Sequence, residues 1–147
     1  MVLTVQTKKK PAITITRTAI KASELVYIAV ANKGIKYRSS SKSRIVYIGT
    51  TKNGPGRIAQ SAAQKAAELL GLHGFKHLEF FVVTSTSMSS IETWRKLERG
   101  LILAFKDQYG EPPKCNTAGK RMKWKDEQEY FTKKRLNSII SHYSTLD

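Results

Sequence analysis

The tripeptide Val-Tyr-Ile occurs twice in this chain, and each copy places a tyrosine inside a β-prone run. Tyr27 lies in LVYIAV, and Tyr47 lies in VYIGTT, where Gly49 follows the tripeptide. A tyrosine hydroxyl can take or give a proton, and nearby cations favour its anion. The repeat therefore indicates either two similar core strands or a paired active-site element.

Arg57 and Glu98 are charged residues at positions where a charge is unfavourable unless it has a partner. Arg57 follows the loop at 53–56 and opens an alanine-rich helix, whose positive end repels it. A bound phosphate would reverse that penalty. Glu98 lies between Trp94 and Leu101 at helical spacing, so it interrupts an apolar stripe and should face inward. A metal ion or Arg57 would offset the cost of that carboxylate, and a purely structural salt bridge is the alternative.

These residues need a scaffold, and the sequence predicts one of the α+β class: a small, mainly antiparallel sheet of three to four strands flanked by helices. The first two strands would pair across a flexible basic loop at 32–43, and Gly49 would turn the chain toward Arg57. The elements that the patterns predict are strands at 12–18, 24–30, 44–50 and 77–84, and helices at 57–70, 91–109 and 124–143.

We expect one domain with three parts. Residues 1–23 form a basic N-terminal arm with an extra strand, residues 24–118 form the core, and residues 119–147 form a basic C-terminal helix.

Five features in order resemble the GIY-YIG nuclease superfamily. That family pairs two strands bearing tyrosine tripeptides, then places an arginine on the next helix, a single glutamate on a later helix and an asparagine in the loop beyond it. The corresponding residues here are Tyr27, Tyr47 with Gly49, Arg57, Glu98 and Asn116. The resemblance covers about residues 24–118.

The resemblance implies an endonuclease that hydrolyses DNA phosphodiester bonds with one divalent ion, Mg²⁺ or Mn²⁺, held on Glu98. Arg57 would bind the phosphate, and either Tyr27 or Tyr47 would be the general base, with Tyr27 the preferred choice. Tyr47 would position the water, and Asn116 would support the site by hydrogen bonding to a tyrosine or to the backbone. The compact build favours a restriction-type, phage or mobile-element enzyme, and a repair or structure-specific nuclease is the alternative.

Three residues depart from the family pattern. Leu25 stands where the first tripeptide has glycine, Ser61 stands where some members have histidine, and Thr50 stands where some have lysine. A non-catalytic nucleic-acid-binding module that keeps the fold is therefore the second hypothesis. A ribosome-associated basic protein is a third, and preference for RNA over DNA would favour it.

The charge of the chain predicts a polyanionic partner. The net charge is +15, and residues 1–60 carry twelve Lys and Arg against the single acid Glu24. Basic groups displace counterions from phosphates, so we expect double-stranded DNA, with homodimerisation as a route to double-strand cleavage. The candidate nucleic-acid contacts are Lys36, Arg38, Lys42, Arg44, Lys52, Lys120, Arg121 and Lys123.

The remaining composition favours an intracellular protein. The chain has one cysteine, Cys115, which cannot form an internal disulfide. No apolar run approaches the ~20 residues of a membrane span, and the N-terminus lacks the apolar stretch of a signal peptide. We therefore expect a cytoplasmic location and no membrane partner.

Overall fold

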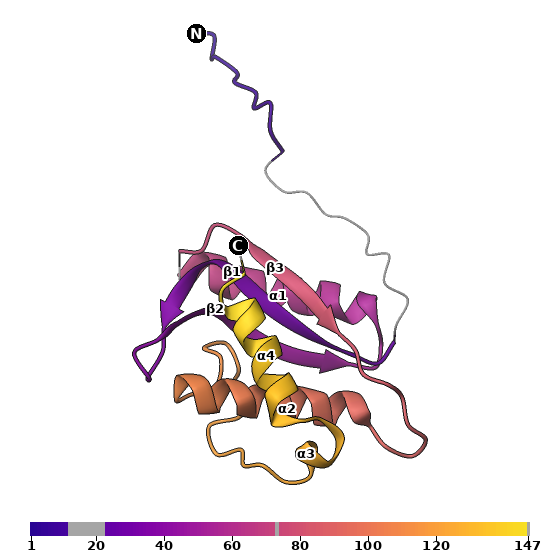
Figure 1. The fold of residues 1–147 in the computed structure, drawn as a ribbon. Helices are drawn as coiled ribbons and strands as arrows, with labels where there is room; N and C mark the ends of the chain where they lie inside the picture. Colours follow the sequence, from indigo (N-terminus) through magenta and orange to yellow (C-terminus); the bar gives the residue numbers. More distant parts are fainter. Residues whose placement is uncertain (12–22, 73, 147) are drawn as a thin grey trace.

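The computed structural model describes residues 1–11, 23–72 and 74–146, and it confirms the predicted α+β class (Figure 1). Three antiparallel strands form one sheet in the order β2-β1-β3. The strands are β1 (Leu25–Lys36), β2 (Lys42–Thr51) and β3 (Leu78–Val83). The extra strand predicted at 12–18 lies outside the described residues.

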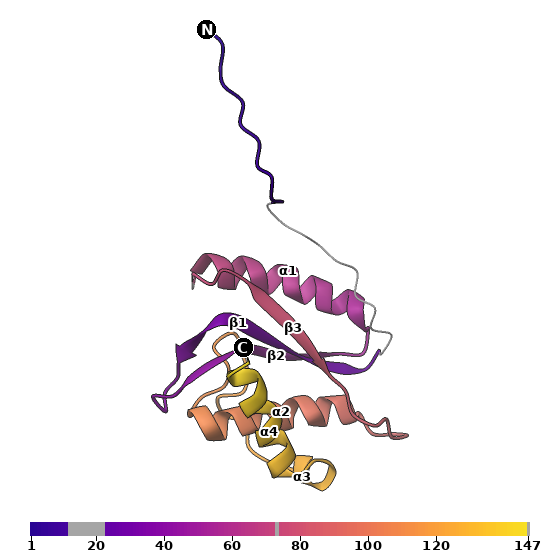
Figure 2. The ribbon, with the colours of Figure 1, turned by 45° about the horizontal axis from the view of Figure 1, so that its top comes forward.

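Helices cover both faces of the sheet. They are α1 (Pro55–Leu72), α2 (Thr93–Tyr109), α3 (Glu127–Tyr130) and α4 (Lys133–Ser144). Figure 2 shows α1 on one face of the sheet, with α2 and α4 on the other. None of the helices in the described part of the chain combines the length and apolar character needed to cross a bilayer.

The central strand β1 is buried on both faces, which explains its continuous apolar sequence. Because side chains alternate along a strand, Val26, Ile28 and Val30 point to one face. They pack into the main core, which also contains residues of β2, α2 and α4. Ala29 and Ala31 belong to a smaller cluster with Leu69 of α1. Tyr27 has the same parity as these alanines and therefore lies on the α1 side.

The loop predicted at 32–43 is mostly strand, so that prediction is wrong. β1 runs to Lys36, and a tight turn at 37–41 leads directly into β2. The sequence here is basic and serine-rich, but Tyr37 anchors it: this side chain is buried, donates a hydrogen bond to the Ile45 carbonyl at 2.7 Å and packs edge-on against Phe105. The pairing of β1 with β2 is irregular between Ala29 and Ile35, where β1 has more residues than the facing part of β2.

The helix predicted at 124–143 is also interrupted, because the chain forms the short α3 and then α4. Thr132 caps α4, since its side chain accepts a hydrogen bond from the Arg135 N–H at 3.2 Å. Glu127 is buried in α3 and pairs with Arg99 of α2 at 2.6 Å. That ion pair fixes α3 beside α2 before the chain turns into α4.

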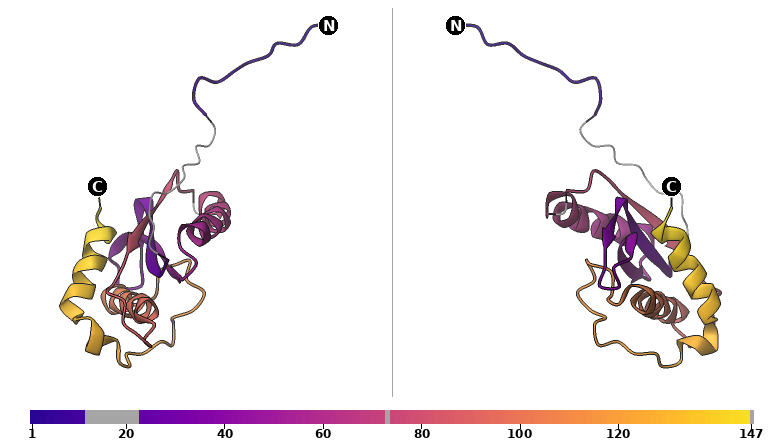
Figure 3. Two further views of the ribbon diagram at one scale, coloured as in Figure 1. Left: turned by 90° about the vertical axis from the view of Figure 1, so that its right-hand side faces the viewer. Right: turned by 60° about the vertical axis from the view of Figure 1, so that its left-hand side comes forward.

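The first eleven residues have no helix or strand and are exposed. Figure 3 shows this segment leading away from the folded part of the molecule. Its exposed apolar side chains are Met1, Val2, Leu3 and Val5.

Candidate active site

The two repeated tyrosines are neighbours on one face of the sheet. Tyr27 pairs with Gly49 across the strands and Tyr47 pairs with Ala29, so the tyrosines are diagonal neighbours. Their ring centroids lie 5.9 Å apart, and Phe80 of β3 flanks Tyr27 on its other side at 6.2 Å. Tyr27 is buried and Tyr47 is half-buried. The repeat in the sequence therefore produces one aromatic pair.

Gly49 has a different role from the one predicted. It lies inside β2 and does not turn the chain, because the turn follows β2 and contains Gly54 at φ 69°. A Cβ atom on Gly49 would lie 2.7 Å from the Tyr27 Cζ and hydroxyl oxygen and 2.7 Å from the Tyr47 Cε1. Glycine is required here because both tyrosine rings occupy the space above it.

Helix α1 contacts both tyrosines. The Tyr27 hydroxyl donates a hydrogen bond to the Ser61 Oγ at 2.9 Å. The Lys65 ammonium lies 4.9 Å from the centroid of the Tyr47 ring. Arg57, one turn before Ser61, is exposed and donates a hydrogen bond to the Gln60 Oε1 at 3.1 Å. Ser61 stands where some GIY-YIG nucleases have histidine, and here it binds the Tyr27 hydroxyl.

Asn116 reaches the site through the backbone of β2. Its Oδ1 accepts a hydrogen bond from the Ile48 N–H at 3.0 Å, and its Nδ2 donates one to the Ile48 carbonyl at 2.8 Å. The Cys115 N–H donates to the Val46 carbonyl at 2.9 Å. Of the two partners expected for Asn116, a tyrosine or a backbone group, the structure has the backbone of the residue that follows Tyr47.

Glu98 is half-buried on α2 and forms no hydrogen bond or ion pair with any other described residue. Among the described residues Glu98 therefore has neither the pairing with Arg57 nor the structural salt bridge that were expected as ways to offset its cost, and Arg57 bonds to Gln60 instead. Burial raises the pKa of the Glu98 carboxyl to about 7, against the lowering effect of Arg95 and Arg99. A nearby cation would favour the ionised form of this carboxylate.

Electrostatic effects connect the tyrosine pair to Glu98 and Arg57. Burial is the largest cause that raises the pKa of Tyr47, and the charge and hydrogen bonding of Tyr27 raise it further. The Glu98 carboxylate also raises this pKa, whereas Arg57 lowers it. Arg57 belongs to α1, on the same side of the sheet as the tyrosines, whereas Glu98 belongs to α2, on the opposite side. The expectation that surrounding cations favour a tyrosine anion is wrong for Tyr47, because burial dominates.

The donor set allows a single divalent ion at most. No cluster of three or more His, Cys, Asp or Glu side chains occurs among the described residues. Glu98 provides a half-buried carboxylate without an ion-pair partner among the described residues, and the remaining ligands of a hard cation would be water and phosphate oxygens. The residues present fit a magnesium-type ion that is bound together with a phosphate.

The main cavities of the described structure lie away from the tyrosine pair and Glu98. One, of about 540 Å³, is lined chiefly by residues after β3, by Leu97 and by residues at 129–139. Another, of about 520 Å³, lies around the Arg99–Glu127 ion pair. The candidate residues line neither of these two cavities.

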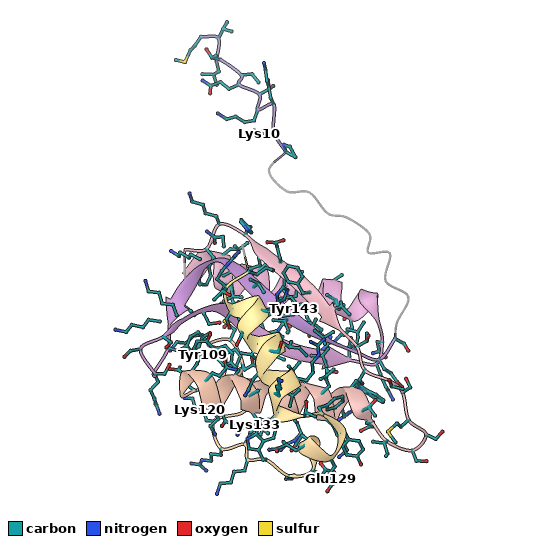
Figure 4. The ribbon with its side chains drawn as sticks, viewed as in Figure 1. Lys10, Tyr109, Lys120, Glu129, Lys133 and Tyr143 are labelled. Atoms are coloured by element: carbon teal, nitrogen blue, oxygen red, sulfur yellow. The ribbon has the colours of Figure 1, made fainter. Side chains whose placement is uncertain are left out.

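The predicted nucleic-acid contacts lie in three separate regions. Lys36, Arg38 and Lys42 are exposed around the hairpin turn, and Lys52 is exposed at the opposite end of β2. Lys120, Arg121 and Lys123 are exposed in the segment before α3, and Figure 4 shows Lys120 beside α2. Arg44 is half-buried and donates to the Ala31 carbonyl at 2.7 Å. Arg44 therefore braces the irregular part of the sheet.

No protein-family model, curated protein or solved structure matches this chain significantly. The resemblance to the GIY-YIG nucleases therefore stays a prediction from the residue pattern. The sequence reasoning gave no role to Lys65 and counted Ser61 only as a departure. Their spacing of four and eight residues from Arg57 is the signal that could have identified both.

Proposed function

We propose that this chain is a divalent-metal-dependent endonuclease of the GIY-YIG type that hydrolyses phosphodiester bonds in double-stranded DNA. The observation that supports the proposal is the tyrosine pair packed over Gly49, with the Tyr27 hydroxyl bonded to Ser61 of α1, one turn after Arg57. Two core tyrosines would explain the packing alone. They would not explain a half-buried carboxylate on α2 that has no ion-pair partner among the described residues.

Each side chain has a role in this proposal. Tyr27 accepts the proton of the attacking water. Tyr47 has a raised pKa, so it stays protonated and donates a hydrogen bond that positions the water. Arg57 is exposed and binds the phosphate oxygens on which charge develops. Glu98 holds the metal ion, which supplies electrostatic stabilisation of the leaving oxygen when bound.

The direct test is incubation of the purified protein with supercoiled plasmid and Mg²⁺, followed by mapping of the ends. We expect nicked or linear DNA from the wild type and from Glu129→Gln, which removes an exposed carboxylate on α3. Glu98→Gln and excess chelator should both abolish cleavage. Full activity in Glu98→Gln or in chelator would refute the mechanism.

A non-catalytic DNA-binding module is the second candidate. The raised pKa of Glu98, about 7, favours it, because burial then leaves this carboxyl only partly ionised at neutral pH, whereas a metal ligand uses the ionised form. This candidate predicts salt-sensitive DNA binding without cleavage at any Mg²⁺ or Mn²⁺ concentration. Binding should then be the same in Glu98→Gln as in the wild type.

A further inference from the structure

Three polar side chains of α1 lie along one side of the helix, and two of them contact the tyrosine pair. Arg57, Ser61 and Lys65 follow one another at intervals of four residues, which brings them to neighbouring positions on a helix. Arg57 acts on the charge of Tyr47, Ser61 binds the Tyr27 hydroxyl, and Lys65 lies over the Tyr47 ring. Only Arg57 was assigned a function above.

Lys65 is held by three partners and has little contact with solvent. Its side chain is 16% exposed, which is low for a lysine. Besides the Tyr47 ring, its ammonium donates a hydrogen bond to the Cys115 carbonyl at 3.3 Å and lies 3.5 Å from the Glu68 carboxylate. A cation over an aromatic face is attracted to it, and the attraction grows as water is excluded. Lys65 therefore joins α1, the Tyr47 ring and the loop that carries Asn116.

The polar contacts matter because α1 has few large apolar anchors. Among the described residues of α1, Leu69 is the member of the buried cluster on this face of the sheet. Much of the rest of the helix is alanine, which buries little apolar surface. Leu69 fixes the C-terminal part of α1, so the depth and rotation of the earlier turns depend on Ser61 and Lys65.

We infer that Lys65 and Ser61 are positioning residues of the proposed nuclease. Lys65 holds the Tyr47 ring and ties it to the 115–116 loop, and Ser61 holds the hydroxyl of Tyr27. Neither side chain touches the substrate. Together they fix the positions of both tyrosine hydroxyls relative to Arg57, which lies on the same helix as Ser61 and Lys65. The inference rests on the proposed function, since the groups that are positioned are those of the proposed site.

The kinetic test compares Lys65→Met, which keeps an unbranched apolar stem and removes the charge, with Lys65→Arg, which keeps a cation that can stack on the ring. Lys76→Met is the matched control, because Lys76 is exposed and lies outside α1. Misplacement of a reacting group by about 1 Å can cost roughly 100-fold. We expect Lys65→Met to lower kcat about 10- to 100-fold with KM for plasmid unchanged, and Lys65→Arg to restore most of it. Ser61→Ala should also lower kcat alone, and Ser61→Thr should retain it.

Two kinetic outcomes would overturn the inference. A rise in KM or in the dissociation constant for DNA at constant kcat would make Lys65 a phosphate contact. Wild-type kcat and KM in both Lys65→Met and Ser61→Ala would show that the contacts have no role in positioning. Thermal melts at the assay conditions would verify that each variant is folded.

A spectroscopic readout separates this inference from the proposed function. With ¹³C-labelled tyrosine, the ring signals of Tyr47 should shift and broaden in Lys65→Met and remain close to wild type in Lys76→Met and Lys65→Arg. The Lys65 CεH₂ protons should show an upfield ring-current shift that Tyr47→Leu removes. If the wild type cleaves no DNA, these shifts still support the positioning contact. Unchanged Tyr47 signals in Lys65→Met would overturn it, whether or not the protein is a nuclease.

Discussion

Substitution of Gly49 by alanine should strain the tyrosine pair. The added Cβ would lie 2.7 Å from atoms of both rings, whereas carbon atoms in contact normally lie 3.5–4.0 Å apart. One or both rings must therefore move by about 1 Å. Tyr27 is only 2% exposed and lies between Tyr47 and Phe80, so it cannot swing into solvent. The strain must therefore be taken up inside the protein, around the Tyr27 ring.

The expected loss of stability follows from that geometry. Overpacking a buried site costs about 1–3 kcal/mol, and restriction of the unfolded chain by alanine returns about 0.4–1 kcal/mol. We therefore expect Gly49→Ala to lower the free energy of unfolding by about 1–2 kcal/mol. For a protein of this size that corresponds to a fall of roughly 2–8 °C in Tm. Plasmid cleavage should fall by up to about 100-fold, because the hydroxyls move.

Urea unfolding followed by tryptophan fluorescence measures the first effect, and the plasmid assay measures the second. Gly71→Ala is the control, because nothing lies within 4 Å of its added Cβ and alanine favours the helix. A Tyr27→Leu background removes two of the three clashing atoms, so Gly49→Ala should cost less there. A wild-type urea midpoint in Gly49→Ala, or an equal cost in both backgrounds, would refute the explanation given for this glycine.

Three other substitutions test separate parts of the structure. Glu98→Gln should be as stable as the wild type near pH 4.5 and more stable by roughly 1–3 kcal/mol above pH 7. The reason is that the folded-state pKa of about 7 makes the wild type lose stability as the pH rises. Urea midpoints across this pH range measure the difference, and parallel curves for the two proteins would contradict the prediction. Asn116→Asp keeps the acceptor for the Ile48 N–H and loses the donor to its carbonyl, so it should cost about 1–2 kcal/mol in urea unfolding, with Asn116→Ala costing more. Glu127→Ala leaves Arg99, whose side chain is 30% exposed, without its partner and should cost about 1–3 kcal/mol at neutral pH, and no measurable cost would show that α3 is held by other contacts.

Local patterns predicted the frame of the fold well. The apolar runs at 24–30 and 44–50 became β1 and β2, and the apolar stripe through Trp94 and Leu101 became α2. The antiparallel pairing of these two strands was predicted and is confirmed, but the tight turn between them was missed because lysine and serine dominate its composition, while one buried tyrosine, Tyr37, holds it. The helix break before α4 was missed because the pattern of apolar residues continues through Thr132, whose capping bond stops the helix.

The site could be predicted as a set of residue types and only partly as a geometry. The space requirement at Gly49 depends on a ring from the opposite strand, and the bonds of Asn116 join segments 68 residues apart. Burial decides the direction of the Tyr47 pKa shift, and net charge in the sequence pointed the other way. Long-range packing therefore determines which of the predicted residues can act together.

The contacts of residues 115–116 also bear on how this protein avoids self-association. β2 is an edge strand, and an edge with free N–H and C=O groups can recruit a strand from another molecule and begin aggregation. The Cys115 N–H donates a hydrogen bond to the Val46 carbonyl. The side-chain amide of Asn116 bonds to both the N–H and the carbonyl of Ile48, as the backbone of a neighbouring strand would. The asparagine thus closes part of the edge without adding a strand. Loss of this side chain should raise the tendency to form β-rich aggregates on heating, apart from any effect on catalysis.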